Sequence, residues 1–301
     1  MLNYLTRNGY VVLTAAVLAA VVHRASIRSE RPRGASGFDS SAEVVLGSLN
    51  VSVDEHVLGV AFAPDGRAVA TGTRAGQVTV WTATGDRRLA WHAHPKPVCA
   101  LCFLIDSQSL VSVDREGALR MWSLSTGEAV LRAEAQGRGP AISAAAAPDG
   151  KTVAVGCVGR VALWDVSSSA LTPVDELSAP GFPINAVTFS ADGSTIAASN
   201  GGNGDAVVWR RGSAGDERIP VSPEFHARGL RFAADGTTLE AVDTDGYVTR
   251  GQAGGPPQVL GRLSGRAIRQ AAHAPGGEKL VVAYMDGTAR LVTDPVGGAE
   301  R

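Results

Sequence analysis

The chain has 301 residues, of which 45% are hydrophobic and 19% are charged, so it can bury a core and is not predicted to be disordered. Its formal net charge is −1, which argues against a general nucleic-acid binder, since such a protein would carry a basic excess. The 36 glycines indicate many turns, and the arginine-dominated positive charge of a chain rich in Ala and Gly hints at a bacterial source.

A hydrophobic run lies near the start of the chain, Tyr10–Val22, and its 13 residues would rise about 20 Å as a helix. The hydrocarbon core of a bilayer is roughly 30 Å thick, so a span is marginal, and the length also suits a signal peptide. Arginines gather on the C-terminal side of the run, at Arg24, Arg28, Arg31 and Arg33. The positive-inside rule keeps such a flank in the cytoplasm.

We therefore predict that residues 1–25 form one N-terminal hydrophobic helix, an uncleaved membrane anchor, with the rest of the chain in the cytoplasm. Two alternatives stay open: a cleaved signal followed by export, and a helix with neither role. Residues 26–41 are polar and are interpreted as a linker, and residues 42–301 as the folded domain.

One pattern recurs six times after residue 42. Its first marker is a tight turn, which returns at intervals of 41 to 43 residues as Pro64-Asp65-Gly66, Ile105-Asp106-Ser107, Pro148-Asp149-Gly150, Ala191-Asp192-Gly193, Ala234-Asp235-Gly236 and Pro275-Gly276-Gly277. The second marker is a glycine before a later strand, at Gly76, Gly117, Gly159, Gly204, Gly246 and Gly287. Two independent markers with one period make chance a poor explanation.

Each copy is predicted to form four short strands. In the first copy these cover residues 57–64, 68–73, 78–81 and 87–92, with turns between them. The Asp-Gly pairs supply the positive-φ positions that tight turns between neighbouring strands need. A period near 42 residues with several short strands is typical of a β-propeller blade. A single blade cannot bury both of its faces, but six blades around an axis can.

The repeats resemble those of the WD-repeat (WD40) β-propeller family. The namesake tripeptide is Leu163-Trp164-Asp165, and the run from Phe62 to Trp81 is close to the family consensus. The resemblance covers residues 43–296. It implies a hydrogen-bonded tetrad of His, Ser or Thr, Asp and Trp in each repeat.

The chain departs from that tetrad. An Asp is expected directly before the third-strand glycine, where the first four copies have Ala75, Glu116, Val158 and Asn203. The copies that do have an Asp there, at Asp245 and Asp286, lack the Trp. We therefore expect the tetrad to be complete in no copy and the blades to pack mainly through apolar contacts.

The last copy has three strands and lacks the fourth. The segment VLGSL at residues 45–49 matches VLGRL at residues 259–263, the fourth strand of the preceding copy, at four of five positions. We predict that residues 43–50 supply the missing outer strand. The predicted fold is all-β: a six-bladed propeller of four-stranded antiparallel blades, closed by this N-terminal strand and preceded by the hydrophobic helix.

The innermost strands carry no Asp or Glu. They cover residues 57–62, 98–103, 141–146, 184–189, 227–232 and 268–273. A hard cation needs several oxygen ligands, and Asn185 with His273 does not provide them. Motifs of nucleophilic hydrolases and of phosphate-binding loops are also missing. We predict a protein that is not an enzyme, with no catalytic residues, no metal and no cofactor.

Cysteine and histidine could still suggest a metal. Cys99 and Cys102 have the spacing of redox and zinc motifs, yet they lie three apart in a predicted strand and so point to opposite faces. Core packing is the favoured reading for them and for Cys157, with metal or redox chemistry as the alternative. His92 and His94 are read as structural, the latter as a loop histidine of the repeat, with a metal site as the alternative.

The resemblance also implies a partner-binding rim built by loops on one side of the ring. Two positions per copy are expected to face outward there. The first set is Leu58, Cys99, Ile142, Asn185, Arg228 and Arg269, and the second is Arg74, Arg115, Cys157, Gly202, Thr244 and Met285. The candidate partner-binding residues are Arg74, Arg115, Asn185, Arg228 and Arg269, because arginine suits carboxylate and phosphate recognition. The alternative is scattered solvated charge.

These readings combine into one functional hypothesis: a membrane-tethered monomeric propeller that acts as an interaction scaffold for an acidic or phosphorylated protein or peptide, and not for nucleic acid. The alternative is an exported propeller that binds a small ligand or acts as a hydrolase or lactonase in its central channel. A third possibility is an inactive remnant of a longer protein.

Overall fold

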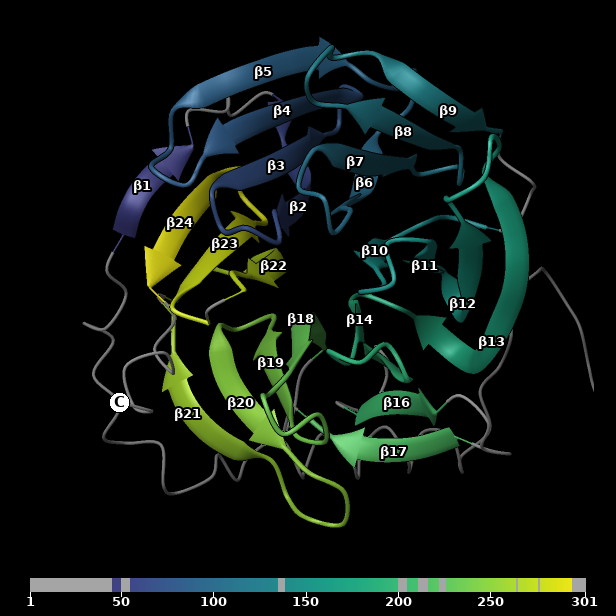
Figure 1. Ribbon diagram of the computed structural model, residues 1–301. Coiled ribbons are helices and arrows are strands. Elements are labelled where there is room, and N and C mark those ends of the chain that lie inside the picture. Colours follow the sequence, from purple (N-terminus) through teal and green to yellow (C-terminus); the bar gives the residue numbers. More distant parts are fainter. Residues whose placement is uncertain are drawn as a thin grey trace, which may run out of the picture. The chain divides into compact units, whose positions relative to one another are not determined.

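The computed structural model describes residues 45–49, 55–134, 139–199, 205–210, 216–221, 226–263, 265–275 and 277–293. All of these belong to one compact unit, Ser40–Arg301. Their strands form six four-stranded antiparallel sheets arranged as blades around a central axis (Figure 1). The predicted six-bladed propeller is confirmed. The predicted helix of residues 1–25 and the linker of residues 26–41 lie outside the described residues, and within the described part no helix is long and apolar enough to cross a membrane.

The first three blades follow the chain from the axis outward. Blade 1 consists of β2 (Val57–Phe62), β3 (Ala68–Thr73), β4 (Gln77–Thr82) and β5 (Arg87–His92). Blade 2 consists of β6 (Val98–Phe103), β7 (Ser109–Asp114), β8 (Leu119–Ser123) and β9 (Ala129–Ala133). Blade 3 consists of β10 (Ser143–Ala146), β11 (Thr152–Gly156), β12 (Val158–Asp165) and β13 (Thr172–Pro183).

Blades 4 and 5 repeat this order. Blade 4 consists of β14 (Val187–Phe189), β15 (Thr195–Ser199), β16 (Asp205–Arg210) and β17 (Asp216–Pro220). Blade 5 consists of β18 (Ala227–Phe232), β19 (Leu239–Asp243), β20 (Tyr247–Gly251) and β21 (Gln258–Arg262).

Blade 6 is built from two distant parts of the chain. Its inner strands are β22 (Ile268–His273), β23 (Lys279–Tyr284) and β24 (Ala289–Thr293), and β1 (Val45–Leu49) lies outside them. In the structure β1 pairs antiparallel with β24, with Leu49 opposite Ala289 (Figure 1). Leu49 is buried in an apolar cluster that also holds residues of blade 1, so this strand contacts two blades.

The first turn of each blade follows the predicted chemistry. Gly66, Gly150, Gly193, Gly236 and Gly277 all have φ between 68° and 70°, a region that only glycine adopts without steric cost. In five of the six turns the side chain of the preceding Asp accepts a hydrogen bond from the backbone N–H two residues on. Blade 2 has Ser107 at the glycine position, with φ 54°, and its Oγ accepts a hydrogen bond from the backbone N–H of Asp65 in blade 1.

The core lies between blades. Six apolar clusters of the described residues each join two neighbouring blades around the ring. In one of them Phe62 and Trp81 of blade 1 pack with Val281 and Leu291 of blade 6. Burial of apolar surface drives this stacking, because each blade has an apolar face on both sides.

In blade 2 the four residues of the tetrad come together, although Nδ1 of His94 has no hydrogen-bond partner among the described residues. Trp122 donates a hydrogen bond from Nε1 to Oγ of Ser112 at 2.8 Å, and Ser112 Oγ lies 2.8 Å from Nε2 of His94. Asp114 Oδ2 lies 3.4 Å from Nδ1 of His94. The sequence reading placed the Asp directly before Gly117, where Glu116 stands. The acid is Asp114, three residues before that glycine, and its Oδ1 accepts backbone hydrogen bonds that close the turn.

Candidate functional site

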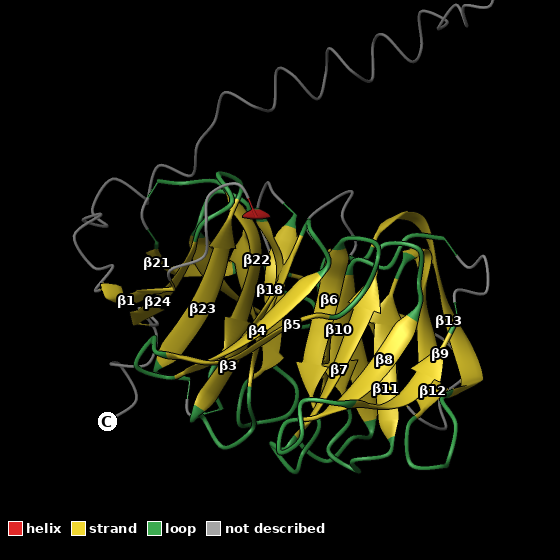
Figure 2. Cartoon of the chain, turned by 90° about the horizontal axis from the view of Figure 1, so that it is seen from above, coloured by secondary structure: helices red, strands yellow, loops and turns green. Residues whose placement is uncertain are grey.

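The central channel has two distinct mouths. The six inner strands run in the same sense along the axis, so all begin at one mouth and end at the other (Figures 1 and 2). We call the mouth where they begin the top mouth and the mouth where they end, at the first turn of each blade, the bottom mouth. The first set of predicted outward positions lies at the top mouth.

Arg228 connects two blades at the top mouth. Its Nη1 donates a hydrogen bond to Oδ1 of Asn185 in blade 4 at 3.0 Å, and its Nε donates to Oγ1 of Thr244 in blade 5 at 3.1 Å. Asn185 is only 7% exposed, whereas Arg228 is half-buried. Neutral partners therefore orient the Arg228 guanidinium.

Arg269 brings a second charge to the same mouth. It lies in β22, one blade on from Arg228, and is half-buried as well. Burial lowers the pKa of Arg228, and the positive charge of Arg269 lowers it further. Among the described residues no carboxylate forms an ion pair with Arg228 or Arg269. The positive charges of Arg228 and Arg269 therefore repel each other.

Arg115 approaches from the other side of the ring. It is exposed at the turn of blade 2 after β7, and its backbone N–H donates to the carbonyl oxygen of Pro97 at 2.8 Å. Burial raises the pKa of the Cys99 thiol to about 11, while the charges of Arg115 and Arg269 act in the opposite direction. Both arginines are thus close enough to Cys99 for their fields to reach it.

The structure therefore brings together Asn185, Arg228 and Arg269, with Arg115 near them across Cys99. Arg74 lies exposed at the equivalent turn of blade 1. Within the described ranges, no side-chain contact joins Arg74 to the other candidates. Thr244 is an additional member, which orients Arg228; it stood among the twelve outward positions but carried no charge to single it out.

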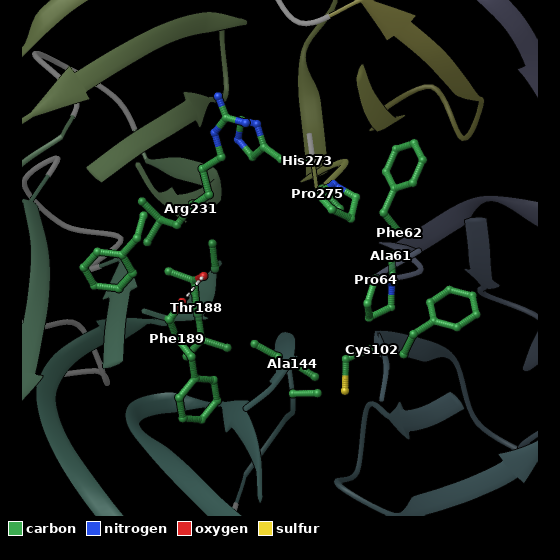
Figure 3. Close-up of a pocket in the computed structure, with 18 of the residues that line it drawn as sticks. Ala61, Phe62, Pro64, Cys102, Ala144, Thr188, Phe189, Arg231, His273 and Pro275 are labelled. Carbon is green, nitrogen blue, oxygen red and sulfur yellow. Dashed lines mark hydrogen bonds between the residues drawn. The ribbon is translucent and has the colours of Figure 1, made fainter. Parts of the chain in front are cut away.

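The channel itself holds a cavity of about 700 Å³. Most of its lining is apolar, from the Ala144–Ala147 run and from phenylalanines and prolines of the other blades (Figure 3). The polar lining includes Arg231 and His273, which the sequence reading did not connect with a site. Both residues lie in predicted inner strands, and inner strands line the channel, so the sequence could have placed them there.

Glu240 is the one carboxylate among the described residues that line this cavity. It is 2% exposed and lies in β19, where it accepts hydrogen bonds from Arg250 at 2.7 and 3.1 Å and from Arg231. A carboxylate held between two guanidinium groups is a poor general base and a poor metal ligand, because its lone pairs are already engaged.

The histidines and cysteines of interest lie apart. His92 is exposed at the end of β5, whereas His94 is fully buried in the blade 2 tetrad, so the two do not converge on one site. Cys99, Cys102 and Cys157 carry free thiols, and burial raises the pKa of Cys102 to about 12. In the described part of the chain no three metal-ligating side chains come together.

Comparisons with known proteins agree with this architecture. The WD40 model, described as "WD domain, G-beta repeat", matches three segments of the chain, residues 47–82, 85–123 and 171–210. With the six-bladed propeller on which these segments lie, the resemblance to the WD-repeat family is confirmed.

The curated relatives are distant. The chain is 24% identical over 239 residues to Autophagy-related protein 16 of Arabidopsis thaliana, covering 78% of this chain and 45% of that protein. It is 20% identical over 252 residues to the SIR4-interacting protein SIF2 of Saccharomyces cerevisiae, covering 76% and 45%. It is also 26% identical over 142 residues to Periodic tryptophan protein 2 of Arabidopsis thaliana, covering 47% and 16%. The chain thus spans less than half the length of these relatives.

Proposed function

We propose that this protein is a non-catalytic scaffold whose propeller binds an acidic segment of a partner protein at the top mouth. One observation carries the proposal: Arg228 and Arg269, half-buried in neighbouring blades, have no carboxylate partner among the described residues. A bound anion would offset both the burial of Arg228 and its repulsion by Arg269.

The geometry of Arg228 suits such a role. A guanidinium has five N–H donors in a planar fork, and the contacts with Asn185 and Thr244 engage two of them. The remaining donors are oriented before a ligand arrives, which reduces the entropy cost of binding. Arg115, and Arg74 on the next rim position, would extend the positive surface for a longer acidic peptide.

The relatives support a protein partner. The name of the yeast relative describes a protein that interacts with SIR4. The channel supports the non-catalytic part of the proposal. Among the described residues that line it, the carboxylate is Glu240, which is already paired with two arginines. The competing hydrolase reading would need free acidic or histidine ligands that converge in the channel.

The proposal has a cellular and an architectural part. We propose that residues 1–25 anchor the chain in a membrane with the propeller, residues 42–301, in the cytoplasm, and that residues 26–41 serve as the linker. We also propose that the strand from residues 43–50 clasps the ring by completing blade 6. The arginines after Val22 support the orientation, and the β1–β24 pairing supports the clasp.

Site-specific photocrosslinking in cells tests where the partner binds. A photoreactive residue is placed at Leu58 on the top mouth, at Ile105 on the bottom mouth, or at Val130 on the outer strand of blade 2. We expect one protein to be captured from Leu58 and not from Val130 or Ile105. Equal capture at all three positions, or capture from Val130 alone, would overturn the top-mouth assignment.

A further inference from the structure

We propose that the partner segment bound at the top mouth carries a large apolar side chain beside its acidic residues. This second requirement rests on the proposed function and makes it more specific. Arg228 and Arg269 would contact the acidic residues, and the half of the mouth formed by blades 1 to 3 would contact the apolar side chain. A mouth that requires both features discriminates among acidic proteins.

The two halves of the top mouth differ in chemistry. Blades 1 to 3 have Leu58, Cys99 and Ile142 at their inner positions, and all three are half-buried. Met285, at the rim position of blade 6, is 37% exposed. We call these four residues the apolar arc. Single exposed apolar residues are ordinary on a protein surface, whereas contiguous ones mark an interaction surface.

The same irregularity of the backbone presents apolar and basic residues at the mouth. The pairing register between the two innermost strands of a blade shifts across Leu58, Cys99, Arg228 and Arg269 and leaves each of them without an opposite residue. An extra residue of this kind bends the strand and redirects its own side chain. The shared presentation supports a shared role for the four side chains.

Backbone contacts make the apolar arc continuous. A Cβ at position 59 would lie 3.0 Å from the carbonyl oxygen of Cys99, so blades 1 and 2 approach closely beside Leu58. The N–H of Val57 donates to the carbonyl oxygen of Gly287 at 3.0 Å, which brings the turn that holds Met285 against the start of β2. The inner strands β6 and β10 also pack together, so the arc extends from blade 6 to blade 3.

The apolar arc borders the basic half of the mouth directly. Gln270 in β22 accepts at Oε1 a hydrogen bond from the N–H of Val60 in β2 at 2.8 Å, which joins the inner strands of blades 6 and 1. Arg269 and Leu58 are the residues of these two strands at the mouth. The field of Arg269 also reaches Cys99, one blade further on. An apolar side chain packed on Leu58 and Cys99 would therefore lie close to a carboxylate bound by Arg269.

A second hydrogen bond joins the two halves at the other end of the arc. Ser143 in β10 donates from Oγ to the carbonyl oxygen of Ile184 at 2.8 Å, a contact from blade 3 to blade 4. Ile142 directly precedes Ser143, and Asn185 directly follows Ile184. The arc thus ends beside the residue that orients Arg228. One short segment could contact both halves of the mouth.

An acidic segment with one large apolar residue complements this arrangement. Its carboxylates suit the guanidinium groups, and its apolar side chain would remove surface of the apolar arc from water, which favours the complex in proportion to the area buried. A purely acidic segment would leave the arc exposed to water. A purely apolar segment would desolvate the guanidinium groups without replacing their hydrogen bonds to water.

Three labelled peptides test this requirement on the full-length chain by fluorescence anisotropy: octaglutamate, and octaglutamate with its fifth residue replaced by leucine or by serine. The leucine and serine peptides carry equal charge, so comparing them isolates the apolar side chain. We expect the leucine peptide to bind about tenfold more tightly than the serine peptide. Equal binding of these two peptides would overturn the apolar requirement and leave the proposed function standing. Failure of all three peptides to bind would overturn both.

Variants locate the apolar contact. Leu58→Ser combined with Ile142→Ser should reduce the affinity for the leucine peptide to that for the serine peptide, without changing the latter. Leu58→Ala is a milder change, which should reduce the preference about threefold and decides the matter if the double variant does not fold. Val130→Ser, which removes a 52% exposed apolar side chain from β9, is the control and should keep the full preference. If either Leu58 variant is folded by circular dichroism and keeps the full preference, the apolar arc is not the contact.

Discussion

The guanidinium of Arg228 donates a hydrogen bond to Oδ1 of Asn185 at 3.0 Å, and this contact crosses from blade 5 to blade 4. The sequence predicted both residues on the same rim, with Asn185 among the candidate partner-binding residues. In the structure Asn185 is an acceptor that positions the arginine. In the proposed function, this buried amide oxygen holds the Arg228 guanidinium in place for a ligand.

The first prediction concerns the top mouth. Arg228→Ala combined with Arg269→Ala should weaken binding of a labelled octaglutamate peptide about tenfold, roughly 1.4 kcal/mol, with folding intact. Wild-type affinity should fall as salt rises, since the contacts are exposed charge contacts. Fluorescence anisotropy between about 50 and 300 mM salt, a range over which ionic screening becomes stronger, provides the measurement.

A matched pair controls that experiment. Arg87 and Arg88 lie exposed on β5, far along the blade from the channel, and their double replacement by Ala removes the same formal charge. This variant should keep the affinity of the wild type. If both double variants lose affinity equally, binding reflects net charge alone and the top mouth has no special role.

The second prediction concerns the blade 2 tetrad. Ser112→Ala would leave Nε1 of Trp122 and Nε2 of His94 buried without their hydroxyl partner, at a cost of about 1–3 kcal/mol in unfolding free energy. Urea denaturation followed by tryptophan fluorescence measures this loss. Ser125→Ala, at an exposed turn of the same blade, should change stability by less than about 0.5 kcal/mol. Equal stability of the two variants would show that the tetrad contributes nothing.

The third prediction is a pH dependence from His94. Burial lowers the pKa of His94 from 6.5 to about 4, although Asp114 acts in the opposite direction. Between these values the unfolded chain binds a proton that the folded chain does not, so stability falls as the pH drops from about 6.5 toward 4, by about 1.4 kcal/mol per unit at most.

The variant His94→Gln removes this titration. Its unfolding free energy should be lower than that of the wild type at pH 7, and it should decline less between pH 6.5 and 4.5. Parallel declines in the two proteins would mean that other groups cause the acid sensitivity.

The fourth prediction concerns ring closure. Deletion of residues 43–50 should expose the edge of β24 and remove Leu49 from its apolar cluster, so the domain should aggregate or lose several kcal/mol, a large part of a typical domain's stability. Deletion of residues 26–33, equally long and within the proposed linker, should leave the melting temperature unchanged. If the deletion of residues 43–50 left the melting temperature of the wild type unchanged, the proposal that this strand closes the ring would be wrong.

The fifth prediction concerns the membrane anchor. Because arginines follow Val22, a reporter fused after Arg301 should be active in the cytoplasm and silent outside it. Replacement of Arg24, Arg28, Arg31 and Arg33 by Gln should weaken this preference. A mature protein that begins near Ala20 by N-terminal sequencing would instead establish a cleaved signal.

The fold could be predicted because its signal repeats. The first turn of each blade needs a residue with positive φ, which favours glycine, and the same requirement recurs in every blade. Ser107 shows the limit of the rule, since its backbone takes the same conformation without being glycine. The hydroxyl of Ser107 binds the neighbouring turn, a contact between blades that no single repeat encodes.

The sites were predictable only in part. The repeat period predicted that Arg228 and Arg269 occupy equivalent positions in neighbouring blades. The contact partner of each side chain, however, lies in another blade, so the sequence of one repeat does not predict it. Asp114 was missed because the acid was sought directly before the glycine and not at the end of β7. Glu240 was missed because a carboxylate in a predicted buried strand gives no hint of the two arginines that hold it.

The shared clusters between blades also determine how the domain comes apart. Each blade contributes one half of two cores, so unfolding any one of them uncovers the faces of both neighbours. An open repeat array can fray from its ends, because a terminal unit has a single neighbour. A ring has no such unit, and melting should therefore be cooperative across all six blades.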